Sequence, residues 1–309
     1  MGGIDLVGDA GVRLHPLVPQ DAPRFKRAVV RQQKRLWCYQ FPFVYCYGSS
    51  NARAVRWAEL DNALSVFVVR ERVDLLFPPL PLSRAALRTS LEIADGCNGD
   101  RSARILWSDE QDAGQLASWG LALQPKGREY LFDPLLIARL EGRGYRDLRK
   151  TLHRVEKARH CVMREFRTTD VADCLALLRA WKKKRRGARL LDMAYTKKAL
   201  RDYPLLDRAD LRGWAIVCDG RVVAFCLGGE ITGDTAGFFA VKSDLSLPGL
   251  GTYARWHFFR QMARYGAVND GGDLGLPGLA QAKQKFRPVE MLEAYAATRP
   301  DRRSQTEQS

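Results

Sequence analysis

A glycine-rich segment at residues 247–253 has the residue types that could hold an anion or a polarised carbonyl. It reads Leu-Pro-Gly-Leu-Gly-Thr-Tyr and lies between an expected strand and an expected helix. Glycines at the start of a helix let backbone N–H groups approach a ligand closely, and the helix dipole adds positive potential there. We therefore expect Gly249, Gly251, Thr252 and Tyr253 to approach a phosphate or a carbonyl group; the alternative is an ordinary turn. It is not a nucleotide P-loop, because Lys and Ser/Thr are missing at the needed spacing.

A second segment, residues 269–283, places a carboxylate beside glycines. Asp273 lies in the glycine-rich turn after Asn269, and Lys283 follows about three helical turns later. Asp273 could bind a substrate ammonium, or it could only cap the helix. No Ser/His/Asp or Cys/His arrangement supports covalent catalysis.

Two runs of cations could bind phosphate groups. Residues 145–159 read YRDLRKTLHRVEKAR, in which cations recur every three or four residues along an expected helix with a narrow apolar face. A second run covers residues 182–186. The candidates for binding the phosphates of a polyanion are Arg146, Arg149, Lys150, Arg154, Lys182, Lys183 and Arg185. The alternative for each run is a solvated charged face.

The overall charge favours a polyanionic partner. The 309 residues include 50 Lys and Arg against 35 Asp and Glu, which gives a net charge of +15. Such a chain accumulates near nucleic acid, acidic membranes or phosphate-bearing molecules. With 46% hydrophobic residues the chain can form ordinary cores, which excludes a disordered or collagen-like protein.

The sequence predicts a soluble, cytoplasmic protein without a metal site. No apolar stretch approaches the roughly 18 residues of a membrane helix, and no secretory signal is visible. The seven cysteines never form a CxxC pair, so we expect small buried thiols in a reducing compartment. The chain has four histidines, and two of them lie in one basic segment. With so few histidine ligands available, the sequence does not favour metal catalysis.

The periodicity predicts two α/β units with a similar order of elements. The first has helices at 21–36, 83–94 and 111–119, with strands at 65–70, 73–77 and 105–107. The second has strands at 129–132, 162–166, 214–218, 222–228 and 235–241, with helices at 133–140, 145–159, 170–184, 251–264 and 277–285. Asp219-Gly220 predicts a type I′ hairpin between two of these strands. The expected division is residues 1–125, 126–297 and a flexible tail, 298–309.

The glycine-rich segment resembles the acyl-donor loop of the GNAT acetyltransferases. Their signature is Arg/Gln-x-x-Gly-x-Gly/Ala, and here Ser246 stands at its leading position. The equivalent place in the first unit, residues 77–81, reads Phe-Pro-Pro-Leu-Pro, and prolines provide no N–H groups. The resemblance implies two tandem GNAT-like domains with mixed, mostly antiparallel sheets, joined by the basic helix, with a donor loop only in the second.

The end of the chain resembles a more specific family. The run DLGLPGLAQAKQKFRP is similar to the closing signature of the phosphatidylglycerol lysyltransferase catalytic domain (DUF2156) family, Asn-x-Glu-x-Asp-Leu-Gly, then Gly-Leu-Arg-x-x-Lys, then an aromatic residue and Pro. Further matching pieces occur in order from about residue 129 to 295. They are Tyr130-Leu131-Phe132-Asp133, Gly144-Tyr145, Arg149-Lys150, Trp181, Val223-Ala224-Phe225, Lys242 and Gly251-Thr252-Tyr253.

This resemblance implies aminoacyl transfer from aminoacyl-tRNA, as donor substrate, to the glycerol hydroxyl of an anionic phospholipid, without a further cofactor. The backbone of residues 249–252 would face the donor carbonyl, and Asp273 with Asn269 would hold the aminoacyl amine. Lys242, at the end of an expected strand, and Lys283 would stabilise phosphate or oxyanion charge. The resemblance therefore makes Asp273, Asn269, Lys242 and Lys283 the catalytic candidates. The domain would then contact the inner face of the membrane peripherally, although the family's separate membrane flippase domain is not seen in this sequence.

Three positions depart from the family pattern. Gly271 and Ala240 stand where the family has Glu, and Ala280 stands where it has Arg. Two acidic groups that could hold a cationic aminoacyl group are therefore missing. A smaller aminoacyl group, a small-molecule acceptor and lost catalysis all remain open. The alternatives are an acyl-CoA-dependent N-acyltransferase and a non-catalytic module that binds RNA or anionic membranes.

Overall fold

The chain folds around one twelve-stranded mixed sheet. The computed structural model describes residues 12–48, 54–99, 101–158, 161–184 and 193–300. The strand order is β1-β2-β3-β4-β5-β12-β6-β11-β10-β9-β8-β7. The strands are β1 His15–Pro16, β2 Ala54–Leu60, β3 Ala63–Val69, β4 Val73–Leu75, β5 Arg104–Ser108, β6 Ala122–Phe132, β7 Cys161–Glu165, β8 Arg212–Cys218, β9 Arg221–Glu230, β10 Thr235–Ser243, β11 Ala267–Asn269 and β12 Glu290–Thr298.

Among the described strands, each half of the sheet contains one parallel pair. All the remaining strand pairs are antiparallel. β4 is parallel to β5 in the N-terminal half, and β10 is parallel to β11 in the C-terminal half. A parallel pair needs a crossover connection. The crossovers here contain helix α3 (Arg84–Gly96) and helix α9 (Leu250–Gln261). The predicted repetition of one α/β unit with mostly antiparallel sheets is confirmed.

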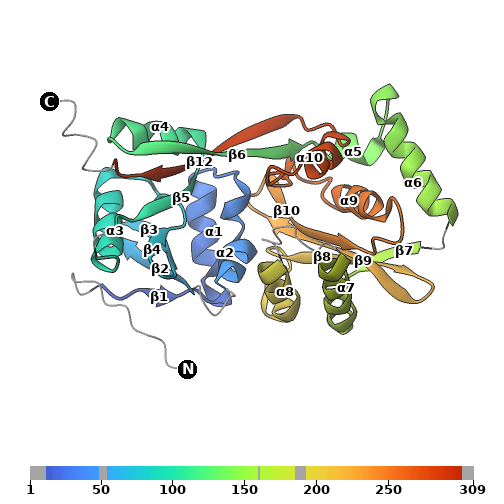
Figure 1. Cartoon of the computed structure of the whole chain (residues 1–309), viewed down its shortest axis with the longest axis horizontal. Coiled ribbons are helices and arrows are strands. Elements are labelled where there is room, and N and C mark those ends of the chain that lie inside the picture. Colours follow the sequence, from blue (N-terminus) through green and yellow to red (C-terminus); the bar gives the residue numbers. More distant parts are fainter. Residues whose placement is uncertain (1–11, 49–53, 100, 159–160, 185–192, 301–309) are drawn as a thin grey trace.

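Strands β6 and β12 connect the two halves. β12 pairs with β5 on one side and with β6 on the other, while the end of β6 pairs with β11. Figure 1 shows this long pair running along the top of the molecule across both halves. The division expected between residues 125 and 126 falls inside β6, and it stays a prediction. The halves are thus linked by this strand pair, and a linking role for the basic helix is not confirmed.

The remaining helices cover both faces of the sheet. They are α1 Ala22–Arg31, α2 Phe41–Tyr47, α4 Glu110–Ser118, α5 Pro134–Arg139, α6 Arg146–Ala158, α7 Val171–Lys184, α8 Met193–Arg201 and α10 Pro277–Gln284. The side chains of Ser83, Asp109 and Asp133 accept backbone N–H groups at the starts of α3, α4 and α5. The helix expected at 21–36 ends at Arg31, because Gln33 adopts a left-handed backbone with φ of 48°.

One hydrophobic core crosses from the N-terminal half to the C-terminal half. It joins Phe25 and Val44 of α1 and α2 to Leu178 and Leu200 of α7 and α8, with Phe239 of β10 between them. On the opposite face, α5, α6 and α9 form a second core, and α3 and α4 form a third. Because the first core is shared, the two halves are packed as one body.

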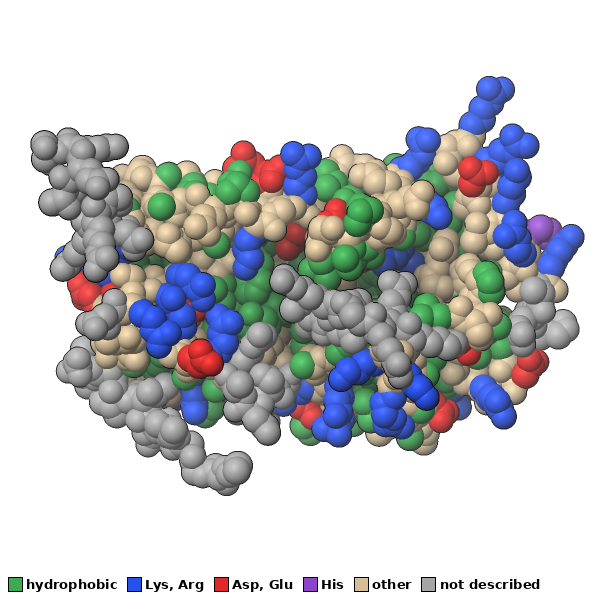
Figure 2. Space-filling view, in the orientation of Figure 1, with side chains coloured by type: hydrophobic (Ala, Val, Ile, Leu, Met, Phe, Trp, Pro, Cys, Tyr) green, Lys and Arg blue, Asp and Glu red, His purple; other side chains and the backbone are tan. Residues whose placement is uncertain are grey.

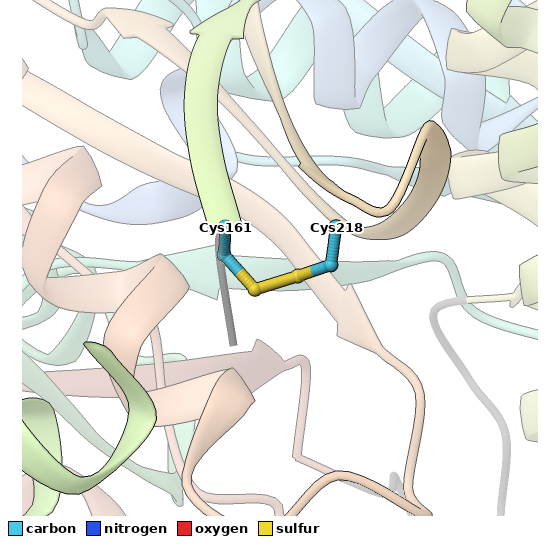
Figure 3. The surroundings of a disulfide bond; sticks show 2 residues. All are labelled: Cys161 and Cys218. Atoms are coloured by element: carbon cyan, nitrogen blue, oxygen red, sulfur yellow. A yellow bond between two sulfur atoms is a disulfide. The ribbon is translucent and has the colours of Figure 1, made fainter. Parts of the chain in front are cut away.

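The expectation that all the cysteines are free thiols is wrong for two of them. Cys161 and Cys218 form a disulfide, with their Cα atoms 4.3 Å apart. Figure 3 shows the bond joining the start of β7 to the end of β8, where the two residues stand opposite each other in the antiparallel ladder. Their separation of 57 residues concealed this pairing in the sequence. Cys38, Cys46, Cys97, Cys174 and Cys226 carry no disulfide.

Candidate active site

The glycine-rich segment connects β10 to α9, as the sequence predicts. Gly249 is the N-cap of α9 and has a left-handed backbone with φ of +84°. Its carbonyl accepts the N–H of Tyr253, and the preceding N–H groups of the first turn have no intrahelical acceptor. A side chain at Gly249 would meet Thr151 and Val155 of α6 at 3.1 Å. Glycine is therefore required by both the backbone angle and the close approach of α6.

The N-terminal half lacks an equivalent opening. In the segment after β4, Leu80 exchanges both backbone hydrogen bonds with Leu64 of β3. The following helix α3 is capped by the hydroxyl of Ser83, which accepts the N–H of Ala86 at 3.1 Å. In α9, by contrast, the N-cap is a glycine and provides no side-chain cap. Only the C-terminal parallel pair thus has a glycine-capped helix start beside it.

The basic helix α6 covers the start of α9 with its apolar face. Leu148, Leu152 and Val155 are buried in the second core. On the outer face, a shallow hollow of about 480 Å³ is lined by Lys150, His153, Arg154 and Lys157. Figure 2 shows blue side chains and one purple histidine along the right edge of the molecule, where α6 lies. The cationic stripe and the candidate donor loop are therefore neighbours.

The predicted phosphate-binding cations differ in their contacts. Arg146, Lys150 and Arg154 are exposed on α6, and Lys182 and Lys183 are exposed on α7. Arg149 instead donates to the backbone carbonyls of Leu140 and Gly142, so its guanidinium holds the turn after α5. Arg185 lies outside the described residues.

A buried polar network joins β6, β11 and the segment before α2. Asn269 is completely buried and donates through Nδ2 to a carboxylate oxygen of Glu129 at 2.6 Å and to the carbonyl of Arg35 at 2.8 Å. The same Glu129 oxygen accepts the backbone N–H of Trp37 at 2.7 Å. Burial raises the pKa of Glu129, and these two donors oppose that shift. Asn269 therefore holds the two halves together and turns its side chain away from solvent.

The next residue continues the network to α9 and α10. Asp270 accepts an ion pair from Arg255 of α9, and its second oxygen lies 3.5 Å from the ammonium of Lys283. Lys283 also donates to the carbonyls of Asp270 and Gly271, and only 2% of it is exposed. Burial lowers the pKa of both cations, that of Arg255 to about 10. Lys283 thus fixes the 269–271 backbone and is not presented to solvent.

Asp273 lies at the rim of this network and is partly exposed. One of its oxygens accepts the hydroxyl of Tyr130 at 2.6 Å, and the other accepts the N–H of Gly275 at 2.9 Å. The Tyr130 ring lies under the Lys283 ammonium, 5.4 Å from it. A carboxylate can accept about four hydrogen bonds, so Asp273 keeps acceptor capacity for a ligand.

An aromatic group lies beside the site. Trp37 packs against Phe43, Tyr195 and Phe239, with ring centroids 4.5–6.0 Å apart. Its indole N–H donates at 2.9 Å to the carbonyl of Phe238, at a bulge in β10. A side chain at Gly271 would start about 3.5 Å from Trp37. The position where the family has Glu therefore faces an aromatic surface here.

The four catalytic candidates are divided over two places. Asn269 and Lys283 belong to the buried network, and Asp273 joins it through Tyr130. Lys242 lies elsewhere, with its ammonium 4.5 Å from the ring of Trp181 on α7. The sequence analysis missed Glu129, Asp270 and Arg255. A usable signal existed for one of them, since Arg255 is a charged residue inside the apolar stretch of α9.

Acidification should destabilise the protein through His257 of α9. Burial, followed by the charge of Arg260, lowers the pKa of this imidazole to about 4. In the unfolded chain the pKa of histidine is about 6.5. The contribution of the neutral imidazole to the free energy of unfolding is therefore fully present above pH 6.5 and is lost as the pH falls toward 4. We expect a loss of about 1–2 kcal/mol between pH 7 and 5, measured by urea unfolding. His257→Phe should remove this slope, whereas His153→Phe on the exposed face of α6 should retain it.

Among the described residues, no helix is long and apolar enough to cross a membrane, and no cluster of three or more His, Cys, Asp or Glu side chains could hold a metal ion.

The chain matches one family model and several solved structures. The model for "Phosphatidylglycerol lysyltransferase, C-terminal" matches residues 39–298. A conserved protein of unknown function from Bacteroides thetaiotaomicron is 20% identical with a TM-score of 0.83, covering 93% of this chain and 99% of its own. L-PGS from Bacillus licheniformis is 15% identical with a TM-score of 0.67, covering 93% and 94%.

A tandem GNAT protein from the clavulanic acid biosynthesis pathway is 11% identical with a TM-score of 0.50, covering 93% and 98%. The expected tandem GNAT fold is confirmed by this likeness. No curated protein matches the chain in sequence.

Proposed function

The chain belongs to the phosphatidylglycerol lysyltransferase C-terminal family, and from this we propose that it transfers an aminoacyl group from aminoacyl-tRNA to an acceptor hydroxyl. The acceptor is the headgroup of an anionic phospholipid such as phosphatidylglycerol. The donor ester is bound at the glycine-capped start of α9, and the tRNA is bound by the cations of α6.

The observation that carries this proposal is the packing of α6 on α9. Thr151 and Val155 of α6 touch the position of Gly249, while Lys150 and Arg154 of the same helix face outward. A nucleic acid held by the outer face of α6 has its phosphates close to the donor loop. An acyl-CoA donor would need no such extended cationic stripe, so this arrangement favours tRNA.

The chemistry assigned to the site is positioning and charge stabilisation. Transfer from an ester to a hydroxyl passes through a tetrahedral oxyanion, which the backbone N–H groups of Gly249, Gly251 and Thr252 would stabilise. The N–H of Leu250 donates instead to the carbonyl of Leu247 at 3.3 Å. Asp273 would accept the ammonium of the aminoacyl group. Asn269 and Lys283 would act as positioning residues that fix the backbone before Asp273, and Lys242 would contribute positive charge near α7.

The absence of two acidic residues limits which aminoacyl groups the site can bind. Gly271 faces Trp37, and Ala240 stands beside the bulge of β10, so neither position provides a carboxylate for a cationic side chain. We therefore propose a neutral aminoacyl group whose α-amine is bound by Asp273 and whose side chain packs near the aromatic group.

The test is transfer from a mixed pool of radiolabelled aminoacyl-tRNAs in the presence of phosphatidylglycerol vesicles. Label in the lipid fraction, carried by a neutral amino acid, is the expected result. Label in a water-soluble product would support aminoacyl-tRNA as the donor and would show that the acceptor is a small molecule and not a lipid. The absence of label in both fractions, together with thermal stabilisation by CoA, would replace the proposal by acyl-CoA transfer. Salt-sensitive RNA binding without any product would indicate a binding module.

Removal of α6 cations should weaken tRNA binding and reduce its dependence on salt. Each phosphate contact contributes roughly 0.7–0.9 to the slope of log affinity against log salt concentration. We expect Lys150→Ala with Arg154→Ala to reduce the slope by about 1.5, measured by filter binding at several salt concentrations. Arg84→Ala with Arg88→Ala, which removes two exposed cations from α3, should leave the slope unchanged. Equal slopes for the double variant and the wild type would contradict the assignment.

A further inference from the structure

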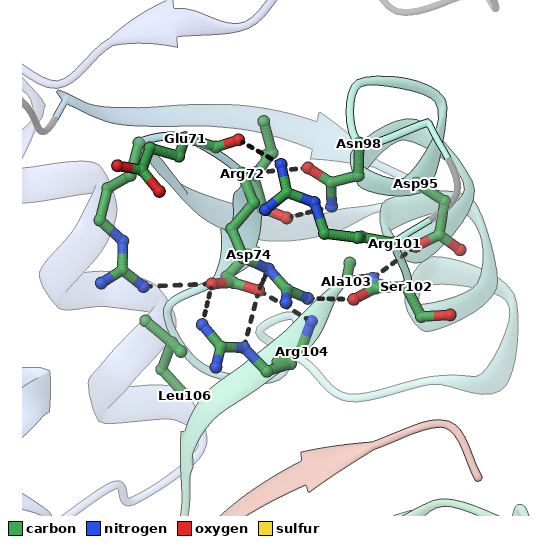
Figure 4. A network of polar contacts seen from close by, with 12 residues as sticks. Glu71, Arg72, Asp74, Asp95, Asn98, Arg101, Ser102, Ala103, Arg104 and Leu106 are labelled. Atoms are coloured by element: carbon green, nitrogen blue, oxygen red, sulfur yellow. Dashed lines mark hydrogen bonds and ion pairs between the residues drawn. The ribbon is translucent and has the colours of Figure 1, made fainter. Parts of the chain in front are cut away.

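A cluster of arginines on the N-terminal half surrounds one buried carboxylate. Asp74 of β4 has a completely buried side chain, and the guanidinium groups of Arg70, Arg72 and Arg104 lie 2.8–3.1 Å from its oxygens. Figure 4 shows Arg72, from the β3–β4 turn, and Arg104, at the start of β5, on either side of Asp74. One carboxylate offsets one of the three charges, so the cluster keeps about two positive charges in excess.

The surrounding backbone holds the cluster in place. Asn98 bonds both the N–H and the carbonyl of Val73, at 2.6 and 2.8 Å. Arg72 donates to the carbonyl of Ser102, and its Nε atom forms an ion pair with Asp74 at 2.9 Å, so its guanidinium is held between the two. The backbone N–H of Arg104 also donates to Asp74 at 3.0 Å. The cations are therefore pre-organised before any ligand arrives.

Arg70 and Arg104 retain unused donors. The exposed fractions of their side chains are 26% and 40%. Each guanidinium has five N–H donors, which is more than the shared carboxylate accepts. The Nε atom of Arg70 is buried and has no hydrogen-bond partner among the described residues. The Nη donors that do not contact Asp74 can thus be offered to a ligand at the surface, whereas the buried Nε of Arg70 cannot.

Lys126 of β6 extends this positive surface. Its ammonium donates to the carbonyl of Leu106 at 2.6 Å, two residues beyond Arg104 on β5, and lies 3.6 Å from the centre of the Trp107 ring. The pKa of Lys126 is lowered to about 8, mainly by withdrawal from water and also by the charges of Arg104 and Arg70, while Cys38 acts in the opposite direction. Figure 2 shows the blue side chains gathered over β3, β4 and β5 at the left of the visible face.

We infer that Arg70, Arg104 and Lys126 form a binding site for a single phosphate group, carried either by a phospholipid headgroup or by a free phosphate ester. Paired N–H donors of arginine match the oxygens of a phosphate, and an anion here would neutralise the excess charge. The site is compact, because Arg70 and Arg104 both reach the same carboxylate. A nucleic acid needs a track of cations, which α6 provides instead. This site lies in the N-terminal half and does not depend on the proposed transfer reaction.

The first experiment measures binding of glycerophosphoglycerol and inorganic phosphate to the full chain by calorimetry at low salt. Both should bind, and Arg70→Ala should weaken the binding about tenfold, the usual effect of losing one charge-assisted hydrogen bond. Arg88→Ala is the matched control and should not change it. Thermal denaturation of each variant checks folding, and Lys126→Gln gives a second variant that leaves Asp74 and its partners in place.

A pH series tests Lys126 directly. Glycerophosphoglycerol carries a diester whose charge is constant between pH 7 and 9, so only the protein titrates. With a pKa of about 8, the protonated fraction of Lys126 falls about tenfold over this range, and the affinity should fall with it. Lys126→Arg should keep its affinity at pH 9, since arginine stays charged.

Flotation with phosphatidylglycerol vesicles separates the two sources of phosphate. Arg70-dependent binding of vesicles identifies a lipid headgroup, and binding of the soluble esters without vesicles identifies a free phosphate ester. The proposed site is overturned if neither glycerophosphoglycerol nor inorganic phosphate binds, or if Arg88→Ala weakens binding as much as Arg70→Ala does. It is also overturned if vesicles bind but glycerophosphoglycerol does not, or if Arg70→Ala reduces only RNA binding.

Discussion

Replacement of Asp273 by asparagine should reduce aminoacyl transfer by about 10²-fold with the fold intact. In the proposed site, this carboxylate receives the ammonium of the aminoacyl group, and an amide cannot replace its charge. Truncating one partner of a hydrogen-bonded charge pair costs about 2–5 kcal/mol when the pair is buried. Because Asp273 is partly exposed, we expect the lower end of this range. The loss should appear mainly in KM for the aminoacyl-tRNA, since the contact forms on binding.

Two further variants show whether Asp273 acts directly. Tyr130→Phe removes the hydroxyl that donates to Asp273 at 2.6 Å but leaves the carboxylate in place. A direct role predicts only a small effect of this change. If Tyr130→Phe reduces transfer as much as Asp273→Asn does, Asp273 only positions the tyrosine. Glu92→Gln, an exposed change of the same charge on α3, is the control and should leave transfer unchanged.

Replacement of Asp270 by alanine should lower the free energy of unfolding by about 3–5 kcal/mol. Asp270 is the ion-pair partner of Arg255, and both side chains are at least nine-tenths buried. Removing one partner of a buried pair leaves an uncompensated charge, which is the costly case. Lys283 would also lose its nearest carboxylate, at 3.5 Å. For a chain of this size, we expect the Tm to fall by about 10 °C, measured by calorimetry.

The double variant Asp270→Ala with Arg255→Met distinguishes this cause from a simple cavity. Removing both charges should recover part of the lost stability, because a buried ion pair replaced by apolar groups is often neutral. Additive losses in the double variant would contradict the uncompensated-charge explanation. Glu92→Ala, at an exposed position, should change the Tm by less than about 2 °C.

The local elements of the C-terminal half could be predicted from the sequence. Asp219 and Gly220 have φ angles of 51° and 77°, as a type I′ turn requires, and they join β8 to β9. The regular spacing of cations and leucines gave helix α6 close to its bounds. The glycine-rich segment gave the start of α9, because a helix entrance depends on a few adjacent residues.

Elements that depend on distant partners were not predicted. β12 reads EMLEAYAAT, which is rich in helix-forming residues, yet it is a strand because β5 and β6 pair with its two edges. Helix α8, which packs on α2, was missed for the same reason. The disulfide was missed because only the β7–β8 register brings Cys161 opposite Cys218.

The sequence by itself determined the family, the repeated α/β unit, the glycine-rich start of α9 and the basic helix, since each depends on local residue patterns. Only the tertiary structure decided what the polar residues do. Asn269 and Lys283 were candidates for chemistry, but folding buries them among backbone carbonyls and Glu129, where a polar group must be hydrogen-bonded. Asp273, four residues after Asn269, is partly exposed, and its carboxylate can accept further hydrogen bonds. The difference is burial, which depends on strands β6, β11 and β12 meeting from distant parts of the chain.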